Sequence, residues 1–115
     1  MSKNDRIRIQ HMLDAGREAV NSAKTHTRAD LVQYPVWTLG LVKCVEIIGE
    51  AAGRVSKETK AHYSQIPWAQ IIAMRNRLVH VYFDIDSDQV WKAITEDLPP
   101  LVRELGKILA AEGEN

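Results

Sequence analysis

The densest group of reactive side chains lies within residues 74–83. It contains two arginines, an asparagine, a histidine and a tyrosine: Arg75, Asn76, Arg77, His80 and Tyr82. Guanidinium groups carry a fixed positive charge and a fork of donors that suits phosphate, and histidine is the side chain best able to move a proton near neutral pH. Together they could cleave RNA without a metal: a base removes the 2′-hydroxyl proton, the oxygen attacks the adjacent phosphorus, and cations stabilise the negative charge that develops.

Helical geometry limits how these groups can converge. At about 100° per residue, Arg75 and His80 lie roughly 140° apart on one straight helix, whereas Asn76 and His80 lie roughly 40° apart. Arg75 and His80 could meet if the helix ends near His80, or if a two-fold axis brings two subunits together at one cleft. We favour the two-fold arrangement. The alternative from spacing alone is that both arginines are solvated and that His80 is a satisfied histidine near the negative end of the helix dipole.

The elements that must position these residues are helices. Apolar residues recur at steps of three and four over residues 5–24, from residue 35 to about 56, from Pro67 onward, and again after Asp86. Residues 28–33 predict a shorter helix, and residues 56–66 contain one possible helical turn. Asp86 and Gln89 have the spacing of a capping box, and Pro99 and Pro100 predict a kink or a break. No stretch alternates as a strand does, so the predicted fold is all-α, a bundle of four main helices plus a short one.

Length and composition describe one domain. The 115 residues are 45% hydrophobic, and neither a repeat nor a linker divides them, so residues 1–115 are expected to form a single domain. Fifteen Lys and Arg balance fifteen Asp and Glu, so a nucleic-acid partner would need a local cluster of positive charge. Cys44 has no partner for an internal disulfide, and no signal-peptide or membrane-span pattern occurs, so we expect a cytoplasmic protein without a membrane partner.

Other polar residues follow less specific patterns. Glu46 and Glu50 lie four apart on the third helix and could line the cleft, pair with an arginine of the fourth helix, or form a solvated face, so neither is given a catalytic role. Asp84, Asp86 and Asp88 lack the glycine and distal glutamate of a calcium loop, which favours helix capping. No cofactor motif is found, and metal-ligand spacing is absent among His11, His26, His62, His80 and Cys44, so we expect no cofactor. Cys44 is expected to be a small core residue. The core is also expected to contain Trp37, Trp68 and Trp91.

The run Arg75, four residues, His80, one residue, Tyr82 resembles the Arg-x4-His-x-Tyr motif of the HepT-like toxins, which are ribonucleases of the HEPN superfamily. The similarity covers most of residues 40–101, in these runs: Val45-Glu-Ile-Ile-Gly-Glu-Ala-Ala52, Ile66-Pro-Trp68, Met74-Arg-Asn-Arg-Leu-Val-His80, Tyr82-Phe83, Val90-Trp91 and Asp97-Leu-Pro99. The resemblance implies a homodimeric helical bundle that cleaves RNA without a metal, with Arg75 and His80 of both subunits lining a shared cleft. Asn76 would orient His80 or the phosphate, and Arg77 would support them.

The resemblance also implies a partner. In a type VII-like toxin–antitoxin pair, an MNT-type (minimal) nucleotidyltransferase antitoxin transfers AMP from ATP to the motif tyrosine, which is Tyr82 here. An adenylyl group there would bring a phosphate and a base beside Arg75 and His80 and compete with RNA. Val81 stands where many relatives have glycine, and a β-branched residue disfavours a left-handed backbone, so the aim of Tyr82 can differ. The alternatives are a non-catalytic helical dimer that binds such a nucleotidyltransferase as a substrate-presenting partner, and a plain helical scaffold.

Overall fold

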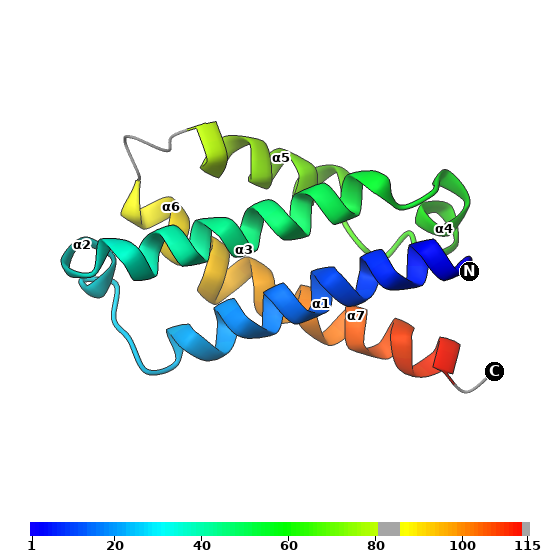
Figure 1. Ribbon diagram of the computed structural model, residues 1–115, viewed down its shortest axis with the longest axis horizontal. Helices are drawn as coiled ribbons and strands as arrows, with labels where there is room; N and C mark the ends of the chain where they lie inside the picture. Colours follow the sequence, from blue (N-terminus) through cyan, green and yellow to red (C-terminus); the bar gives the residue numbers. More distant parts are fainter. Residues whose placement is uncertain (81–85, 114–115) are drawn as a thin grey trace.

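The protein is described by a computed structural model, which covers residues 1–80 and 86–113 (Figure 1). Within these residues the chain is helical and no strand occurs, which confirms the predicted all-α fold. The elements, in chain order, are α1 (Lys3–Ala23), α2 (Asp30–Gln33), α3 (Pro35–Arg54), α4 (Lys57–His62), α5 (Trp68–His80), α6 (Ser87–Lys92), the π-helical turn η1 (Ala93–Asp97) and α7 (Leu98–Gly113).

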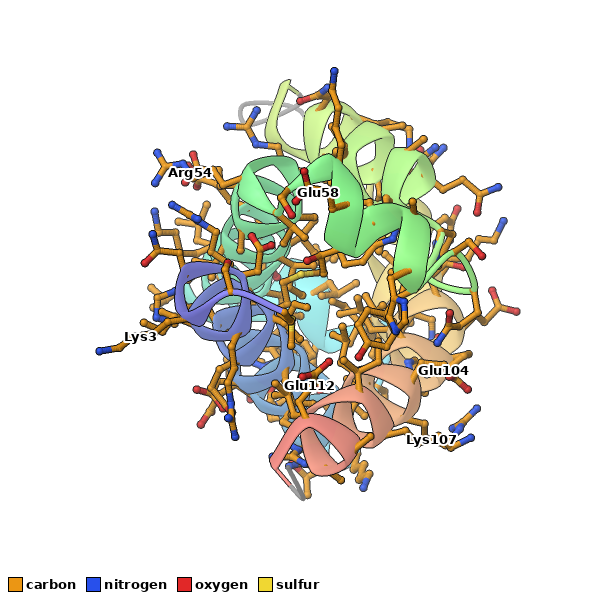
Figure 2. The ribbon with its side chains drawn as sticks, turned by 90° about the vertical axis from the view of Figure 1, so that its right-hand side faces the viewer. Lys3, Arg54, Glu58, Glu104, Lys107 and Glu112 are labelled. Carbon is orange, nitrogen blue, oxygen red and sulfur yellow. The ribbon has the colours of Figure 1, made fainter. Side chains whose placement is uncertain are left out.

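The four long helices pack as a bundle in which α3 is central. Figure 1 shows α3 between α1 and α5, with α7 crossing behind α1, and the pairs α1–α3, α3–α5 and α1–α7 are in closest contact. The view along the bundle in Figure 2 shows charged side chains such as Lys3, Arg54 and Lys107 pointing outward from this arrangement. The site-bearing helix α5 therefore rests on α3 and reaches the rest of the core through it.

The core is formed by the apolar stripes that the sequence predicts, with one exception. The largest fully buried side chains come from all four long helices, from α6 and η1, and from the connection before α5: Ile9, Met12, Val45, Ile48, Ile66, Leu78, Val90, Ile94, Leu98 and Leu105. Trp68 is buried, and Trp37, Trp91 and Cys44 are partly buried against the same core, as expected. Leu39 also fits the three- and four-residue spacing of the α3 stripe and would be expected in the core, but its side chain is 40% exposed and shares the outer side of α3 with the exposed Val36 and Ile47.

Local sequence signals explain most helix ends. Pro35 occupies the first turn of α3, and the Asp86 carboxylate accepts hydrogen bonds from the backbone N–H groups of Asp88 and Gln89, so the predicted cap of α6 is confirmed. The possible turn within residues 56–66 is α4, which Ser56 caps through its side chain.

The irregularity predicted near the two prolines is a π-helical turn that separates α6 from α7. Pro99 and Pro100 lie in the first turn of α7, directly after the π-helical turn η1. Proline has no N–H to donate and its ring crowds the carbonyl of the residue four positions earlier. The wider π turn gives that crowded backbone room, so α6, η1 and α7 continue as one helical segment.

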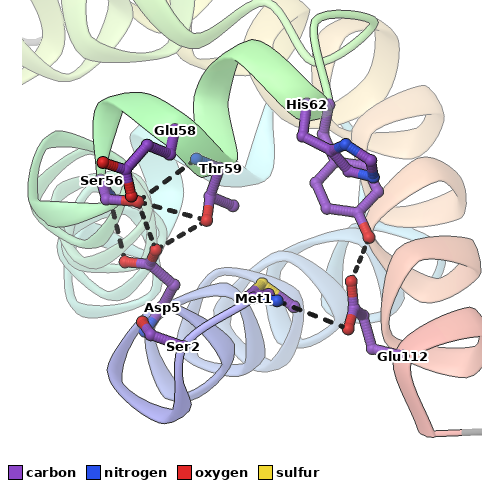
Figure 3. A pocket seen from close by; sticks show the side chains of 9 residues that line it. Met1, Ser2, Asp5, Ser56, Glu58, Thr59, His62 and Glu112 are labelled. Atoms are coloured by element: carbon purple, nitrogen blue, oxygen red, sulfur yellow. Dashed lines mark hydrogen bonds and ion pairs between the residues drawn. The ribbon is translucent and has the colours of Figure 1, made fainter. Parts of the chain in front are cut away.

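A buried carboxylate ties the start of α1 to α4 at the opposite end of α5 from His80. Asp5 is 3% exposed, and its carboxylate accepts hydrogen bonds from the Ser56 backbone N–H, the Ser56 hydroxyl and the Thr59 hydroxyl at 2.6–3.0 Å (Figure 3). Burial by itself raises the pKa of Asp5, but these hydrogen bonds together lower it by a larger amount. The pKa of Asp5 therefore lies below its ordinary value. A depression of about 550 Å³ opens beside this network, where the Tyr63 hydroxyl donates to Glu112.

Candidate active site on helix α5

The arginine-rich face of α5 is aimed by the apolar residues between its polar ones. Ile71, Met74 and Leu78 are buried at steps of three and four, so they fix the rotation of α5 on the core. Arg75 follows Met74 and is turned toward α3, while Arg77 is turned toward the other side of the helix. The same periodicity that forms the core therefore sets where each arginine points.

Arg75 is held by hydrogen bonds to two neighbours. Its Nη2 lies 3.2 Å from Oε1 of Glu50 on α3, and its Nη1 donates to Oδ1 of Asn76 at 3.0 Å. The side chain of Arg75 is 28% exposed and that of Glu50 is 49% exposed, so the ion pair sits at the edge of the α3–α5 contact. Of the alternatives that the sequence left open for Glu50, the structure shows pairing with an arginine of the motif helix.

Gly49 gives the Arg75 side chain its place against α3. A Cβ atom built on Gly49 would lie 2.2 Å from Cβ and 2.4 Å from Cγ of Arg75, far inside van der Waals contact. Any side chain at position 49 would push α5 away from α3. Sequence reasoning missed Gly49, although an interior helix glycine, which costs about 0.5–1 kcal/mol relative to alanine, was a signal of close approach.

The Arg75 Nε is buried and has no hydrogen-bond partner among the described residues. A guanidinium has five N–H groups. Glu50 and Asn76 each take one, and the Nε–H faces the protein interior. One hydrogen on each Nη nitrogen remains as a donor that Arg75 can offer to a phosphate.

The other predicted site residues of α5 are placed differently. Asn76 is exposed next to Arg75 and accepts its hydrogen bond, so these two act together. Arg77 is exposed and lines a depression of about 410 Å³ between α5 and the start of α7, together with Glu96 and Asp97. The structure does not bring Arg77 to Arg75 within this chain.

The remaining motif residues lie at or beyond the end of the described part of α5. His80 is the last residue of α5, and the structure describes its backbone but not its side chain. Val81, Tyr82 and Asp84 lie outside the described residues. The predicted meeting of Arg75 with His80 and the predicted modification of Tyr82 therefore stay predictions.

The neighbours of Glu46, His26 and Cys44 lie away from Arg75. Glu46 pairs with Lys43 at 3.5 Å on the same helix, one turn before Glu50. His26 stacks on Trp37 with ring centroids 4.1 Å apart and its Nδ1 lies 2.8 Å from the Ser22 carbonyl oxygen. Burial, followed by the nearby negative charge of Glu18, raises the pKa of Cys44.

Neither a metal-binding cluster nor a membrane-spanning helix occurs among the described residues. Across residues 1–80 and 86–113, no group of three or more His, Cys, Asp or Glu side chains is arranged to hold a metal ion. None of the helices described for these residues combines the length and apolar character that crossing a membrane requires.

Comparison with known proteins gives the class and then the family. The helical bundle is the HEPN type of fold that the motif residues led us to expect. The family model described as "Ribonuclease HepT-like" matches residues 12–108, which include Gly49, Glu50, Arg75 and His80. The chain therefore belongs to the HepT-like ribonuclease family.

Individual relatives agree with this membership. A "Putative RNase" of Caldanaerobacter subterraneus subsp. tengcongensis is 33% identical over 110 residues, which is 96% of this chain and 98% of that protein. A "Putative RNase" of Methanocaldococcus jannaschii is 26% identical over 106 residues, 91% of this chain and 97% of that protein. A "Probable ribonuclease HepT" of Thermococcus cleftensis is 35% identical over 68 residues, 59% of this chain and 62% of that protein. No solved structure matches the chain significantly.

Proposed function

We propose that the protein is an endoribonuclease that cleaves RNA without a metal, with Arg75 and His80 as its catalytic residues. The observation that carries this proposal is the guanidinium of Arg75, which two neighbours hold with two N–H donors left free on an exposed edge. Membership of the HepT-like ribonuclease family supports it, because the matched span contains both residues.

The reaction follows from the chemistry of these two groups. His80 removes the proton of a ribose 2′-hydroxyl, and the resulting oxygen attacks the adjacent phosphorus. The bond from phosphorus to the 5′-oxygen of the next nucleotide breaks, and that oxygen takes up a proton, leaving a 2′,3′-cyclic phosphate and a 5′-hydroxyl. Arg75 stabilises the added negative charge on the phosphate oxygens as the bond forms. Asn76 orients the Arg75 guanidinium through its amide oxygen, and Arg77 supports RNA binding from the neighbouring face.

A two-fold homodimer fits this chemistry better than a single chain does. Arg75 and His80 lie roughly 140° apart around the axis of α5, so a second subunit can supply the group that one helix turns away. The outer side of α3 exposes Val36, Leu39 and Ile47, which are apolar residues that a second copy could cover.

Regulation by a nucleotidyltransferase partner completes the proposed function. In a type VII-like toxin–antitoxin pair, an MNT-type antitoxin would transfer AMP to Tyr82, which lies two residues after His80 in sequence. The added phosphate would then occupy the positive charge that RNA needs. An RNA substrate and an ATP-dependent partner are both consistent with a cytoplasmic location.

The test is cleavage of total cellular RNA, tRNA included, by purified protein in excess EDTA. We expect the native chain to cleave RNA and His80→Ala to be inactive, while His62→Ala, which changes an exposed histidine of α4, stays active. An intact-mass spectrum shows whether Tyr82 already carries AMP. Absence of cleavage by unmodified, folded native protein would contradict the proposal and favour the non-catalytic dimer that binds a nucleotidyltransferase.

A further inference from the structure

Glu50 is the described carboxylate that contacts the guanidinium proposed for catalysis. Its Oε1 lies 3.2 Å from Arg75 Nη2, and it comes from a helix 25 residues away in sequence. Glu50 follows Gly49, whose missing side chain lets the Arg75 alkyl chain pack against α3. Two successive residues of α3 therefore determine where Arg75 lies and how its planar head is turned.

The hydrogen-bonding pattern fixes the head of Arg75 in orientation as well as in position. Glu50 holds Nη2 and Asn76 holds Nη1, so rotation about the last bonds of the side chain would break one contact or the other. The buried Nε leaves no other edge to present to solvent. With the head held in this way, one hydrogen on each Nη nitrogen remains available to a phosphate oxygen.

Basic side chains line a depression on the other side of Glu50. Arg8 and His11 of α1 and Arg54 of α3 line a depression of about 280 Å³ with Glu50, and no ion pair of Arg8 or Arg54 occurs among residues 1–80 and 86–113. The polyanionic backbone of RNA would be attracted to this surface. Glu50 borders this depression and forms its ion pair with Arg75.

We propose that Glu50 is a positioning residue for RNA cleavage: its carboxylate oxygen holds the Arg75 guanidinium in the orientation that receives the scissile phosphate. This inference rests on the proposed ribonuclease function. The role proposed for Glu50 depends on its oxygen as a hydrogen-bond acceptor more than on its negative charge. Arg75 needs a partner that fixes its orientation, while the positive charge of Arg75 is needed for the reaction itself.

The experiment compares Glu50→Ala, Glu50→Gln and the matched control Glu46→Ala in steady-state cleavage of one RNA substrate. Glu46 has the same residue type on the same helix but pairs with Lys43. Loss of the Glu50 contact frees Arg75 to turn, so we expect kcat of Glu50→Ala to fall about 10- to 100-fold, with KM little changed. Glutamine keeps an oxygen acceptor, so Glu50→Gln should recover at least about tenfold in kcat over Glu50→Ala.

The outcomes separate this inference from the function on which it rests. If the native chain does not cleave RNA, the proposed function fails first. If the native chain cleaves RNA and Glu50→Ala keeps the native kcat, Glu50 does not position Arg75, and the inference is overturned. If Glu50→Ala and Glu50→Gln both have a higher kcat than the native chain, Glu50 inhibits cleavage, and the inference is also overturned. Equal losses of kcat in Glu50→Gln and Glu50→Ala would also overturn it. Circular dichroism melting of all variants shows that the comparison is made on folded protein.

Discussion

Replacing Gly49 by alanine tests the close contact between α3 and α5. The added Cβ would lie 2.2 Å from Cβ of Arg75, whereas carbon atoms in contact are normally about 3.5–4.0 Å apart, so the helices must separate by more than about 1 Å. The clashing atom is next to the α5 backbone and cannot swing away as the end of a side chain could. Overpacking of this kind costs about 1–3 kcal/mol, and the better helix propensity of alanine returns about 0.5–1 kcal/mol.

Gly53→Ala is the matched control for this perturbation. It lies on the same helix, and a Cβ there has nothing within 4 Å, so only the propensity gain applies and Gly53→Ala should be as stable as the native chain or more so. Comparing the two variants isolates the packing cost of about 1–3 kcal/mol, which corresponds to about 4–12 °C in Tm for a domain near this size. Urea and thermal unfolding measure it. Equal stability of the two variants would refute the contact, and RNA cleavage by Gly49→Ala should fall about 100-fold if Arg75 is displaced.

Two further predictions concern residues away from α5. Asp5→Asn should lower the free energy of unfolding by about 1–3 kcal/mol at pH 7, because the hydroxyls of Ser56 and Thr59 lose a charged acceptor. The folded pKa of Asp5 is below its ordinary value of 3.8, so its stabilising contribution is full above that pH and is lost as pH falls through the folded pKa. Urea unfolding should therefore show the gap between the native chain and Asp5→Asn narrowing below pH 4, and a constant gap would contradict this. Cys44, whose pKa burial and Glu18 raise, should react with iodoacetamide at pH 8 more slowly than in unfolded protein, as mass spectrometry can show; equal rates would rule out this burial.

The helices could be predicted from sequence because each carries its own signal. The buried steps on α1 and α3, Pro35 at a helix start and Asp86 as a cap all depend on neighbours in the sequence, and the structure confirms them. The exposed Leu39 was not predictable in this way. Its spacing fits the apolar stripe, and its exposure depends on which sides of α3 the other helices cover.

The candidate site was only partly predictable for the same reason. Residues of the motif were identified from their types, but their partners come from another helix. Glu46 and Glu50 have the same chemistry and both lie on α3, yet only the packing of α5 decides that Glu50 meets Arg75. Likewise α3 contains three glycines, and sequence alone does not distinguish Gly49 from Gly40 and Gly53, which have nothing near them.

The π-helical turn before the two prolines limits how the length of this segment can change. A π turn amounts to one extra residue within an α-helix. A one-residue deletion within Ala93–Asp97 returns this turn to α-helical spacing and keeps the faces of α6 and α7, whereas the same deletion early in α7 would rotate α6 by about 100° relative to the rest of α7. The contact of α6 with α2 and the burial of Val90 would then be lost, although every side chain type was retained. One-residue insertions and deletions in related chains should therefore fall in the connections between helices or within this π turn, and should spare the α-helical turns of α6 and α7.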